Sequence, residues 1–142
     1  MKLEQISVFL ENRAGQLAEL IHALAEEGID ILGLSLADTS DFGILRLVVL
    51  DGRRAIEALM RRGFATGKTA VLAVALKNEA GALDSLLALL SKAGVNVEYM
   101  YGCSSSQPGQ AAMIFRFDKT DEALRLLPAH GFKLLSLEEL GA

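Results

Sequence analysis

The sequence is poor in the residues that build disulfides and metal sites. Its 142 residues include one cysteine, two histidines, two prolines and no tryptophan. A single cysteine excludes an internal disulfide framework and a multi-cysteine zinc site. No HExxH or CxxC motif occurs, so the sequence predicts neither a metal site nor any other cofactor.

Long apolar runs and an excess of positive charge are also missing. The longest apolar runs, Ala70–Leu76 and Leu86–Leu90, fall well short of the roughly 20 residues that a membrane span needs. With 18 acidic against 14 basic residues, the chain has no general attraction for nucleic acid. We therefore expect neither a membrane nor a nucleic acid as partner. A solvated helix face explains the four clustered arginines, Arg53, Arg54, Arg61 and Arg62.

The composition does contain enough apolar residues for a folded core. Hydrophobic residues make up 51% of the chain and the net charge is only −4, which is incompatible with disorder. The first residues, Met1–Gln5, show no apolar secretory region. Together with the free cysteine, this predicts a cytoplasmic protein.

The first half of the sequence recurs in the second half. At a shift of roughly 66 positions, Val8–Leu17 (VFLENRAGQL) aligns with Val74–Leu83 (VALKNEAGAL), sharing Val, Leu, Asn, Ala, Gly and Leu in order. The alignment continues through the glycines Gly28 and Gly94. This conserved order of landmarks indicates an internal duplication, so the chain is a pair of small units rather than one ordinary domain.

Apolar periodicity predicts the same elements in each half. In the first half we expect strands at Gln5–Leu10, Ile29–Ala37, Ile44–Leu50 and Phe64–Thr66, and helices at Leu17–Leu24 and Arg53–Arg62. In the second half we expect strands at Ala70–Leu76, Val95–Tyr101, Ala112–Phe117 and Lys133–Ser136, and helices at Leu83–Leu90 and Asp121–Leu127. We expect Asp51 to cap a helix, glycines to stop the helices, and Pro128 to end the last one. A turn at Asp38–Asp41 and a long loop at Ser104–Gly109 complete the pattern.

The predicted order in each half is βαββαβ. Since a strand–helix–strand crossover is right-handed, both helices cover one face of the sheet. We predict an α+β fold of two ferredoxin-like units, residues 1–67 and 68–142, each a four-stranded antiparallel sheet with two helices on one face. Units of about 65–70 residues have thin cores. We therefore expect them to pack side by side, within the chain or between chains of a homodimer or higher homo-oligomer.

One polar feature occurs in both halves, at the loop between the first strand and the first helix. Asn12-Arg13-Ala14-Gly15 and Asn78-Glu79-Ala80-Gly81 each precede a helix N-terminus. Free backbone amides and the helix dipole favour an anion there, and an asparagine amide both donates and accepts, which suits a zwitterion. The alternative is that each asparagine only caps its helix or makes an Asx turn. A second polar position, Asp30 or Asn96, lies two residues after the glycine that ends the helix, where the alternative role is a solvent-facing turn residue.

The sequence offers little for catalysis. His22 and His130 are placed as surface or helix-end residues, and Cys103 has no histidine near it in the sequence. Neither a Walker loop nor a GxGxxG motif before a helix occurs. The acylphosphatases share the βαββαβ order, but their glycine-rich phosphate loop with an arginine is not matched here, since Arg13 has Glu79 as its counterpart. We therefore predict a protein that is not an enzyme and has no catalytic residues.

The repeated segments resemble the ACT domain family. Glu11–Leu17 with Glu27–Ile31, and Asn78–Leu83 with Ala93–Val97, look like the signature of that family, which often has a proline where this chain has Ala14 and Ala80. Because the similarity covers nearly the whole chain, the sequence is similar to a protein of two ACT domains.

The resemblance implies a regulatory protein that binds a small molecule, usually an amino acid, at an interface between ACT domains. The loop of one unit and the start of strand two of its neighbour would form each site. The implied ligand-binding residues are Asn12, Arg13, Ala14, Gly15, Leu17, Asp30, Asn78, Ala80, Gly81, Leu83 and Asn96. Asp30 departs from the asparagine of serine-sensing members, and Leu10 and Leu76 stand where some members have a histidine.

Two functions therefore compete. The first is an allosteric amino-acid sensor whose regulated partner is a separate protein. The alternative is a ligand-free structural or adaptor module that docks on a partner protein.

Overall fold

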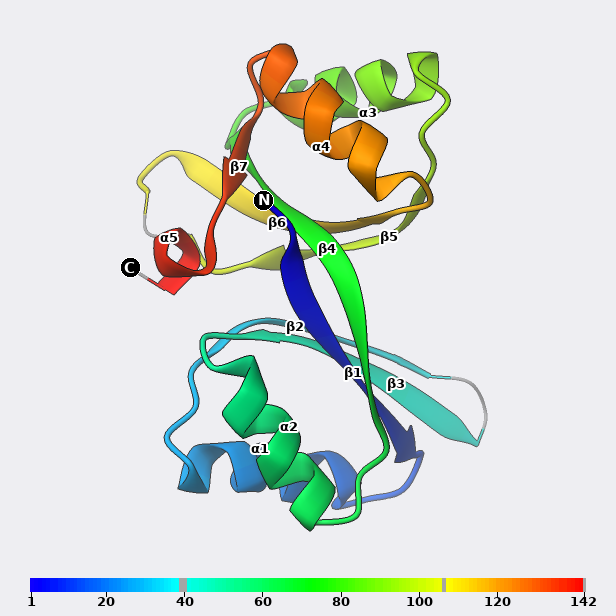
Figure 1. Ribbon diagram of the computed structural model, residues 1–142, viewed down its shortest axis with the longest axis vertical. Helices are drawn as coiled ribbons and strands as arrows, with labels where there is room; N and C mark the ends of the chain where they lie inside the picture. The colour runs from blue at the N-terminus through cyan, green and yellow to red at the C-terminus, as the bar shows by residue number, and fades with distance from the viewer. Residues whose placement is uncertain (39–40, 106, 142) are drawn as a thin grey trace. The chain divides into compact units, whose positions relative to one another are not determined.

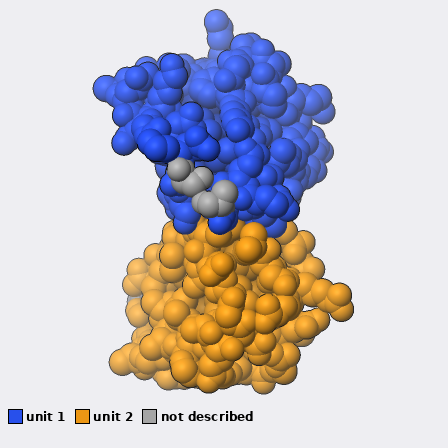
Figure 2. Space-filling view, turned by 90° about the vertical axis from the view of Figure 1, so that its left-hand side faces the viewer, with its two compact units in different colours: residues 1–3, 70–142 blue, residues 4–69 orange. Residues whose placement is uncertain are grey.

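The computed structural model describes residues 1–38, 41–105 and 107–141. The chain forms two compact units (Figure 2): an N-terminal unit of residues 4–69, drawn as unit 2, and a C-terminal unit of residues 1–3 and 70–142, drawn as unit 1. The domain boundary between residues 67 and 68 stays a prediction. The expected turn at Asp38–Asp41 and loop at Ser104–Gly109 lie partly outside the described residues.

The N-terminal unit has the predicted order of elements, except that its last predicted strand is part of the long strand that begins the next unit (Figure 1). Its elements are β1 (Leu3–Glu11), α1 (Gln16–Glu26), β2 (Ile31–Asp38), β3 (Phe42–Val49) and α2 (Gly52–Arg61). Strand β3 is the central strand and pairs antiparallel with both β1 and β2. The backbone nitrogen of Phe9 donates to the carbonyl oxygen of Ala65 at 3.2 Å, which brings the chain before the next strand alongside β1.

The C-terminal unit repeats this order and adds a short helix (Figure 1). Its elements are β4 (Thr66–Lys77), α3 (Ala82–Lys92), β5 (Val97–Cys103), β6 (Gln110–Phe117), α4 (Thr120–Ala129), β7 (Lys133–Leu135) and α5 (Leu137–Gly141). Strand β6 pairs antiparallel with β5 and with β4, and β7 pairs antiparallel with the other edge of β4. Among the described residues every helix is too short to cross a lipid bilayer.

Strand β4 corrects the prediction of two separate four-stranded sheets. The described residues contain seven strands rather than eight, because one strand of 12 residues runs from Thr66 to Lys77. The sequence predicts separate strands at Phe64–Thr66 and Ala70–Leu76. The intervening Gly67-Lys68-Thr69 contains no proline, and its glycine does not end the strand, so the extended backbone continues through it.

Each unit has its own apolar core between its sheet and its two helices. In the N-terminal unit, Leu20 and Leu24 of α1 are fully buried with Val8 and Leu45 of the sheet. In the C-terminal unit Leu86 and Leu90 take the corresponding helix positions. Its sheet contributes two larger side chains, Phe115 and Phe117, whose rings stack with centroids 5.3 Å apart.

The helix ends agree with the prediction except at Pro128. Asp51 caps α2 by accepting a hydrogen bond from the backbone nitrogen of Arg54 at 3.2 Å. A positive φ is found at each predicted glycine stop, namely Gly28, Gly63, Gly94 and Gly131. Helix α4 does not end before Pro128 but continues to Ala129. A proline in the last turn removes only one backbone hydrogen bond, and the nitrogens of His130 and Phe132 still bond to the carbonyl of Leu127.

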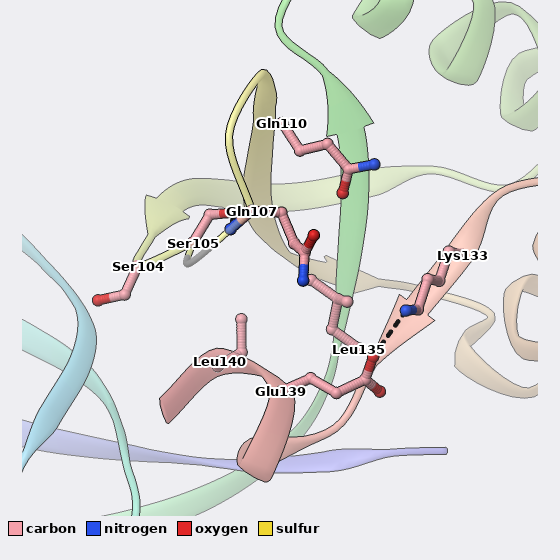
Figure 3. A pocket seen from close by; sticks show the side chains of 8 residues that line it. All are labelled: Ser104, Ser105, Gln107, Gln110, Lys133, Leu135, Glu139 and Leu140. Atoms are coloured by element: carbon pink, nitrogen blue, oxygen red, sulfur yellow. Dashed lines mark hydrogen bonds and ion pairs between the residues drawn. The ribbon is translucent and has the colours of Figure 1, made fainter. Parts of the chain in front are cut away.

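Helix α5 is missing from the sequence prediction, although Ser136 and Glu139 carry its signal. The Ser136 hydroxyl accepts from the nitrogen of Glu139, and the Glu139 carboxylate accepts from the nitrogen of Ser136, both at 3.2 Å. This reciprocal pair is a capping box. Lys133 adds an ion pair to Glu139 at 2.8 Å (Figure 3), and Leu140 is buried. The start of the short helix is therefore held by its capping box and by the ion pair to β7.

We expect the buried phenylalanine Phe117 to be a main source of stability in the C-terminal unit. Phe117→Ala leaves a cavity in the core and is expected to lower the free energy of unfolding by about 3–5 kcal/mol. Phe42→Ala is the matched control, because Phe42 is exposed, and it should change the free energy by less than about 1 kcal/mol. Urea denaturation of both variants measures the difference. Equal losses would contradict the assignment of the core.

The anchoring of α5 is expected to depend on pH. The Lys133 ammonium and the Ser136 backbone lower the pKa of Glu139 below its ordinary value. A lowered pKa in the folded state means that the ionised carboxylate stabilises the fold at neutral pH, and that this contribution is lost as the pH falls through that pKa. The difference in unfolding free energy between wild type and Glu139→Gln should therefore shrink on acidification. Glu138→Gln is the control. A difference in unfolding free energy between wild type and Glu139→Gln that does not change with pH would refute the role of the ionised Glu139 carboxylate.

Candidate ligand-binding site

The two loops after β1 and β4 have the same backbone geometry. Gly15 has φ 87° and ψ −15°, and Gly81 has φ 91° and ψ −14°. The hydrogen bonds repeat as well: the carbonyl of Gly15 accepts from the nitrogen of Glu19 at 2.9 Å, and that of Gly81 accepts from Ser85 at 3.0 Å. The sequence repeat is therefore also a repeat in three dimensions.

The structure excludes a helix-capping role for the loop asparagines Asn12 and Asn78. Glycine occupies the N-cap position of α1 and of α3, so neither Asn12 nor Asn78 is the cap residue that the sequence allowed. Their backbone nitrogens donate across the end of the sheet instead, Asn12 to Asp41 at 3.0 Å and Asn78 to Gly109 at 2.8 Å. Both asparagines are exposed.

Leu17 and Leu83 do not belong to the core, contrary to the prediction of an apolar helix stripe that includes them. Their side chains are 36% and 38% exposed, and Leu87 is also at the surface. The second residue of each helix lies in the first turn beside the loop, beyond the buried part of the helix face. In both units an apolar side chain is thus presented next to the glycine of the loop.

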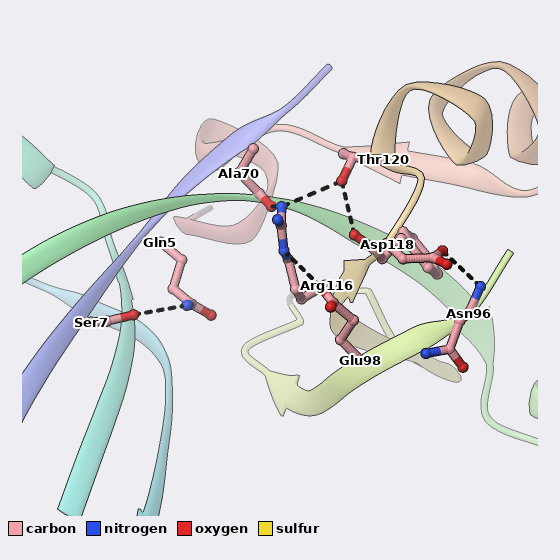
Figure 4. Close-up of polar contacts among 9 residues, drawn as sticks. Gln5, Ser7, Ala70, Asn96, Glu98, Arg116, Asp118 and Thr120 are labelled. Carbon is pink, nitrogen blue, oxygen red and sulfur yellow. Dashed lines mark hydrogen bonds and ion pairs between the residues drawn. The ribbon is translucent and has the colours of Figure 1, made fainter.

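The second predicted position, Asp30 or Asn96, lies far from the loop of its own unit. Glu11, which precedes the loop, pairs with Phe42 at the start of β3, whereas Ile31 pairs with Val49 at its end. The eight residues of β3 separate these ends by about 24 Å. In the C-terminal unit the backbone of Asn96 is held at the corresponding end by the carboxylate of Asp118 at 2.9 Å (Figure 4). One unit therefore does not bring the loop and this position together.

A hollow of about 340 Å³ lies beside the loop of the N-terminal unit. It is lined by parts of β1, the loop, α1, the start of β3 and the segment after α2, namely Phe9, Leu10, Glu11, Arg13, Gln16, Glu19, Phe42, Arg62, Gly63, Phe64 and Ala65. Of the predicted site residues it includes only Arg13. Sequence reasoning missed Phe9, Phe42 and Arg62, because no local motif marks residues that only the pairing of β1 with β3 and the packing of α2 bring together.

The C-terminal unit has a smaller hollow of about 110 Å³ (Figure 3). The labelled side chains around it come from the loop after β5, from the start of β6, and from β7 and α5, and none is a predicted site residue. The ion pair of Lys133 with Glu139 crosses part of its wall.

Other reactive or charged groups include the free cysteine, the residue types that ligate metals and the four clustered arginines. Burial raises the pKa of the Cys103 thiol to about 11, which keeps it protonated and unreactive at neutral pH. Within the described residues no three side chains of histidine, cysteine, aspartate or glutamate gather as a metal site. The predicted solvated arginine face is a network of ion pairs, in which Arg54 and Arg61 contact Glu27, Arg62 contacts Glu26, and Arg53 contacts Glu57.

The two units are thus tandem copies of one α+β fold, each with a glycine-led loop at its first helix. The family of ACT domain pairs matches residues 1–140. The chain therefore belongs to the ACT domain pair family.

Solved structures agree with this assignment. Protein BT0572 from Bacteroides thetaiotaomicron superposes with a TM-score of 0.92 at 36% identity, over 99% of this chain and 96% of that chain. The ligand-free regulatory subunit of aspartate kinase from Thermus thermophilus shares the fold, with a TM-score of 0.60 at 18% identity over 89% of this chain and 91% of that one. A comparison with curated protein sequences gives no match.

The loop geometry depends on glycine at two positions. An alanine at Gly15 or Gly81 meets no neighbouring atom within 4 Å, so its cost comes from the left-handed backbone alone. We expect Gly15→Ala and Gly81→Ala each to lower the free energy of unfolding by about 1–2 kcal/mol. Gly102→Ala, in open space on strand β5 without a positive φ, is the control and should cause no loss. Thermal or urea unfolding measures all three, and an unaffected Gly15→Ala variant would contradict the loop geometry.

Proposed function

We propose that this chain is an allosteric regulatory protein that binds an amino acid at its β1–α1 and β4–α3 loops and is not itself an enzyme. The observation that carries the proposal is the same left-handed glycine and hydrogen-bond pattern at both loops, in a member of the ACT domain pair family. This repeated geometry supports a ligand-binding role for both loops.

The chemistry of the loops suits a carboxylate. The backbone amides at Leu17 and Leu83 lie in the first turns of their helices, where the helix dipole favours an anion. An asparagine amide at Asn12 or Asn78 adds a donor and an acceptor for the polar groups of an amino acid. The backbone of Ala14, Gly15, Ala80 and Gly81 would then line the site.

A complete site needs more than one unit in this proposal. Because Asn96 and Asp30 are far from the loop of their own unit, each would close a site from another unit, in the same chain or in a second copy. The homo-oligomer predicted from the thin cores provides such a second copy. Asn96 donates and accepts, whereas the Asp30 carboxylate only accepts, so the two sites would differ in strength.

Regulation would follow from differential binding. A ligand shifts a conformational equilibrium only by the difference in its affinity for the two states. In this proposal the amino acid stabilises one packing of the units, which a separate cytoplasmic protein recognises.

Calorimetric titration of the full chain with each of the twenty amino acids tests the proposal. We expect at least one to bind, and the double variant Asn12→Ala/Asn78→Ala to lose that binding and the accompanying thermal stabilisation. The double variant Arg53→Gln/Arg125→Gln is the control, because it changes two exposed polar side chains on α2 and α4 and leaves both loops intact. Absence of binding by all twenty at millimolar concentration would refute the sensor and favour the adaptor module.

A further inference from the structure

The hollow beside the N-terminal loop has aromatic side chains that the core does not use. Phe9 and Phe42 are 56% and 59% exposed, and both line the hollow together with Phe64. Phe42 is placed there because it begins β3 opposite Glu11, one diagonal step from Phe9. Large apolar side chains that stay at the surface around a concavity are typical of a site for an apolar group.

The charges of the same hollow are balanced. Arg13 and Arg62 supply two guanidinium groups, and Glu11 and Glu19 supply two carboxylates. Arg13 donates to Glu11 through Nε at 3.0 Å, and Arg62 donates to Glu26 through one terminal nitrogen. Since a guanidinium has five N–H donors, both arginines keep donors for a ligand carboxylate. The glutamates are acceptors for an ammonium group.

The C-terminal unit does not repeat this chemistry. The repeat aligns Phe9 with Ala75 and Arg13 with Glu79. Gln110 begins β6 opposite Lys77, as Phe42 begins β3 opposite Glu11. His130 is the C-cap of α4, as Arg62 is the C-cap of α2. The aromatic walls and the pair of arginines are thus present in one unit only.

We propose that the hollow of the N-terminal unit selects a zwitterionic amino acid with a large apolar or aromatic side chain, and that the loop of the C-terminal unit does not. The inference rests on the proposed function and names its ligand class. The ligand carboxylate meets Arg13 and Arg62, its ammonium meets Glu19 or Glu11, and its side chain packs on Phe9 and Phe42.

The test is calorimetric titration of the full chain with L-phenylalanine, L-leucine, glycine, phenylpropanoate and phenethylamine. L-phenylalanine should bind about tenfold or more tightly than glycine, because glycine makes no contact with the aromatic walls. Phenylpropanoate lacks the ammonium and phenethylamine lacks the carboxylate, so each should bind about tenfold or more weakly than L-phenylalanine. Glycine binding as tightly as L-phenylalanine would overturn the proposal.

Matched variants locate the site. Phe42→Ala should weaken L-phenylalanine binding by about tenfold or more, whereas Gln110→Ala, at the equivalent position of the other unit, should leave it unchanged. Arg62→Gln should weaken binding to a similar extent. Glu26→Gln removes the ion pair between Arg62 and Glu26 but keeps the Arg62 guanidinium, so it should not weaken binding.

The outcomes separate this inference from the proposed function. Binding of a small polar amino acid that depends on Asn12 and Asn78 but not on Phe42 would overturn the inference and leave the proposed function intact. Binding of none of the twenty amino acids would overturn both. The inference is supported if Phe42→Ala loses L-phenylalanine binding while its unfolding transition stays that of the wild type. Gln110→Ala should then bind L-phenylalanine as tightly as the wild type does.

Discussion

The packing of two helices on one sheet face determines where every loop of this chain lies. Leu20 and Leu24 hold α1 against the sheet, and Leu86 and Leu90 hold α3. Each helix must therefore turn back along its sheet within four residues of the strand before it. Glycine in the left-handed region makes that reversal at Gly15 and Gly81. The shape of both loops is thus a consequence of core packing, and the ligand site proposed for them is positioned by the buried helix and strand on either side.

Much of the fold was predictable because it is encoded locally. The period-two alternation of strands, the helix stripes and the glycines after them are all short-range signals, and the repeat doubles each of them. The continuous strand β4 was not predictable in the same way. Gly67-Lys68-Thr69 has no apolar alternation and its glycine favours a turn, so only the pairings on either side of it decide that the backbone stays extended. Helix α5 was overlooked although its capping box, Ser136 with Glu139, is visible in the sequence.

The hollow beside the N-terminal loop was predictable from the sequence only at Arg13, for a related reason. The loop residues Asn12–Gly15 and Asn78–Gly81 form a contiguous motif, so the sequence shows them directly. Phe42 and Arg62 line the hollow beside the N-terminal loop together with Arg13, although they come from other parts of the chain. Their place depends on the register of β3 against β1 and on where α2 ends, which a single sequence does not reveal. The exposure of Leu17 and Leu83 was missed because helical spacing alone does not show where the sheet beneath the helix stops.

Strand β4 has a consequence for how such a protein changes over evolutionary time. The boundary between the compact units, at Thr69 and Ala70, falls inside this strand and not in a linker. A gene split at that point would leave each product with a truncated strand and an unpaired edge that invites aggregation. Insertions are disfavoured there too, because an odd number of residues would turn every later side chain of the strand to the opposite face. A split or an insertion within β4 is therefore expected to cost both units part of their sheets, so the two copies diverge at their surfaces more readily than they separate.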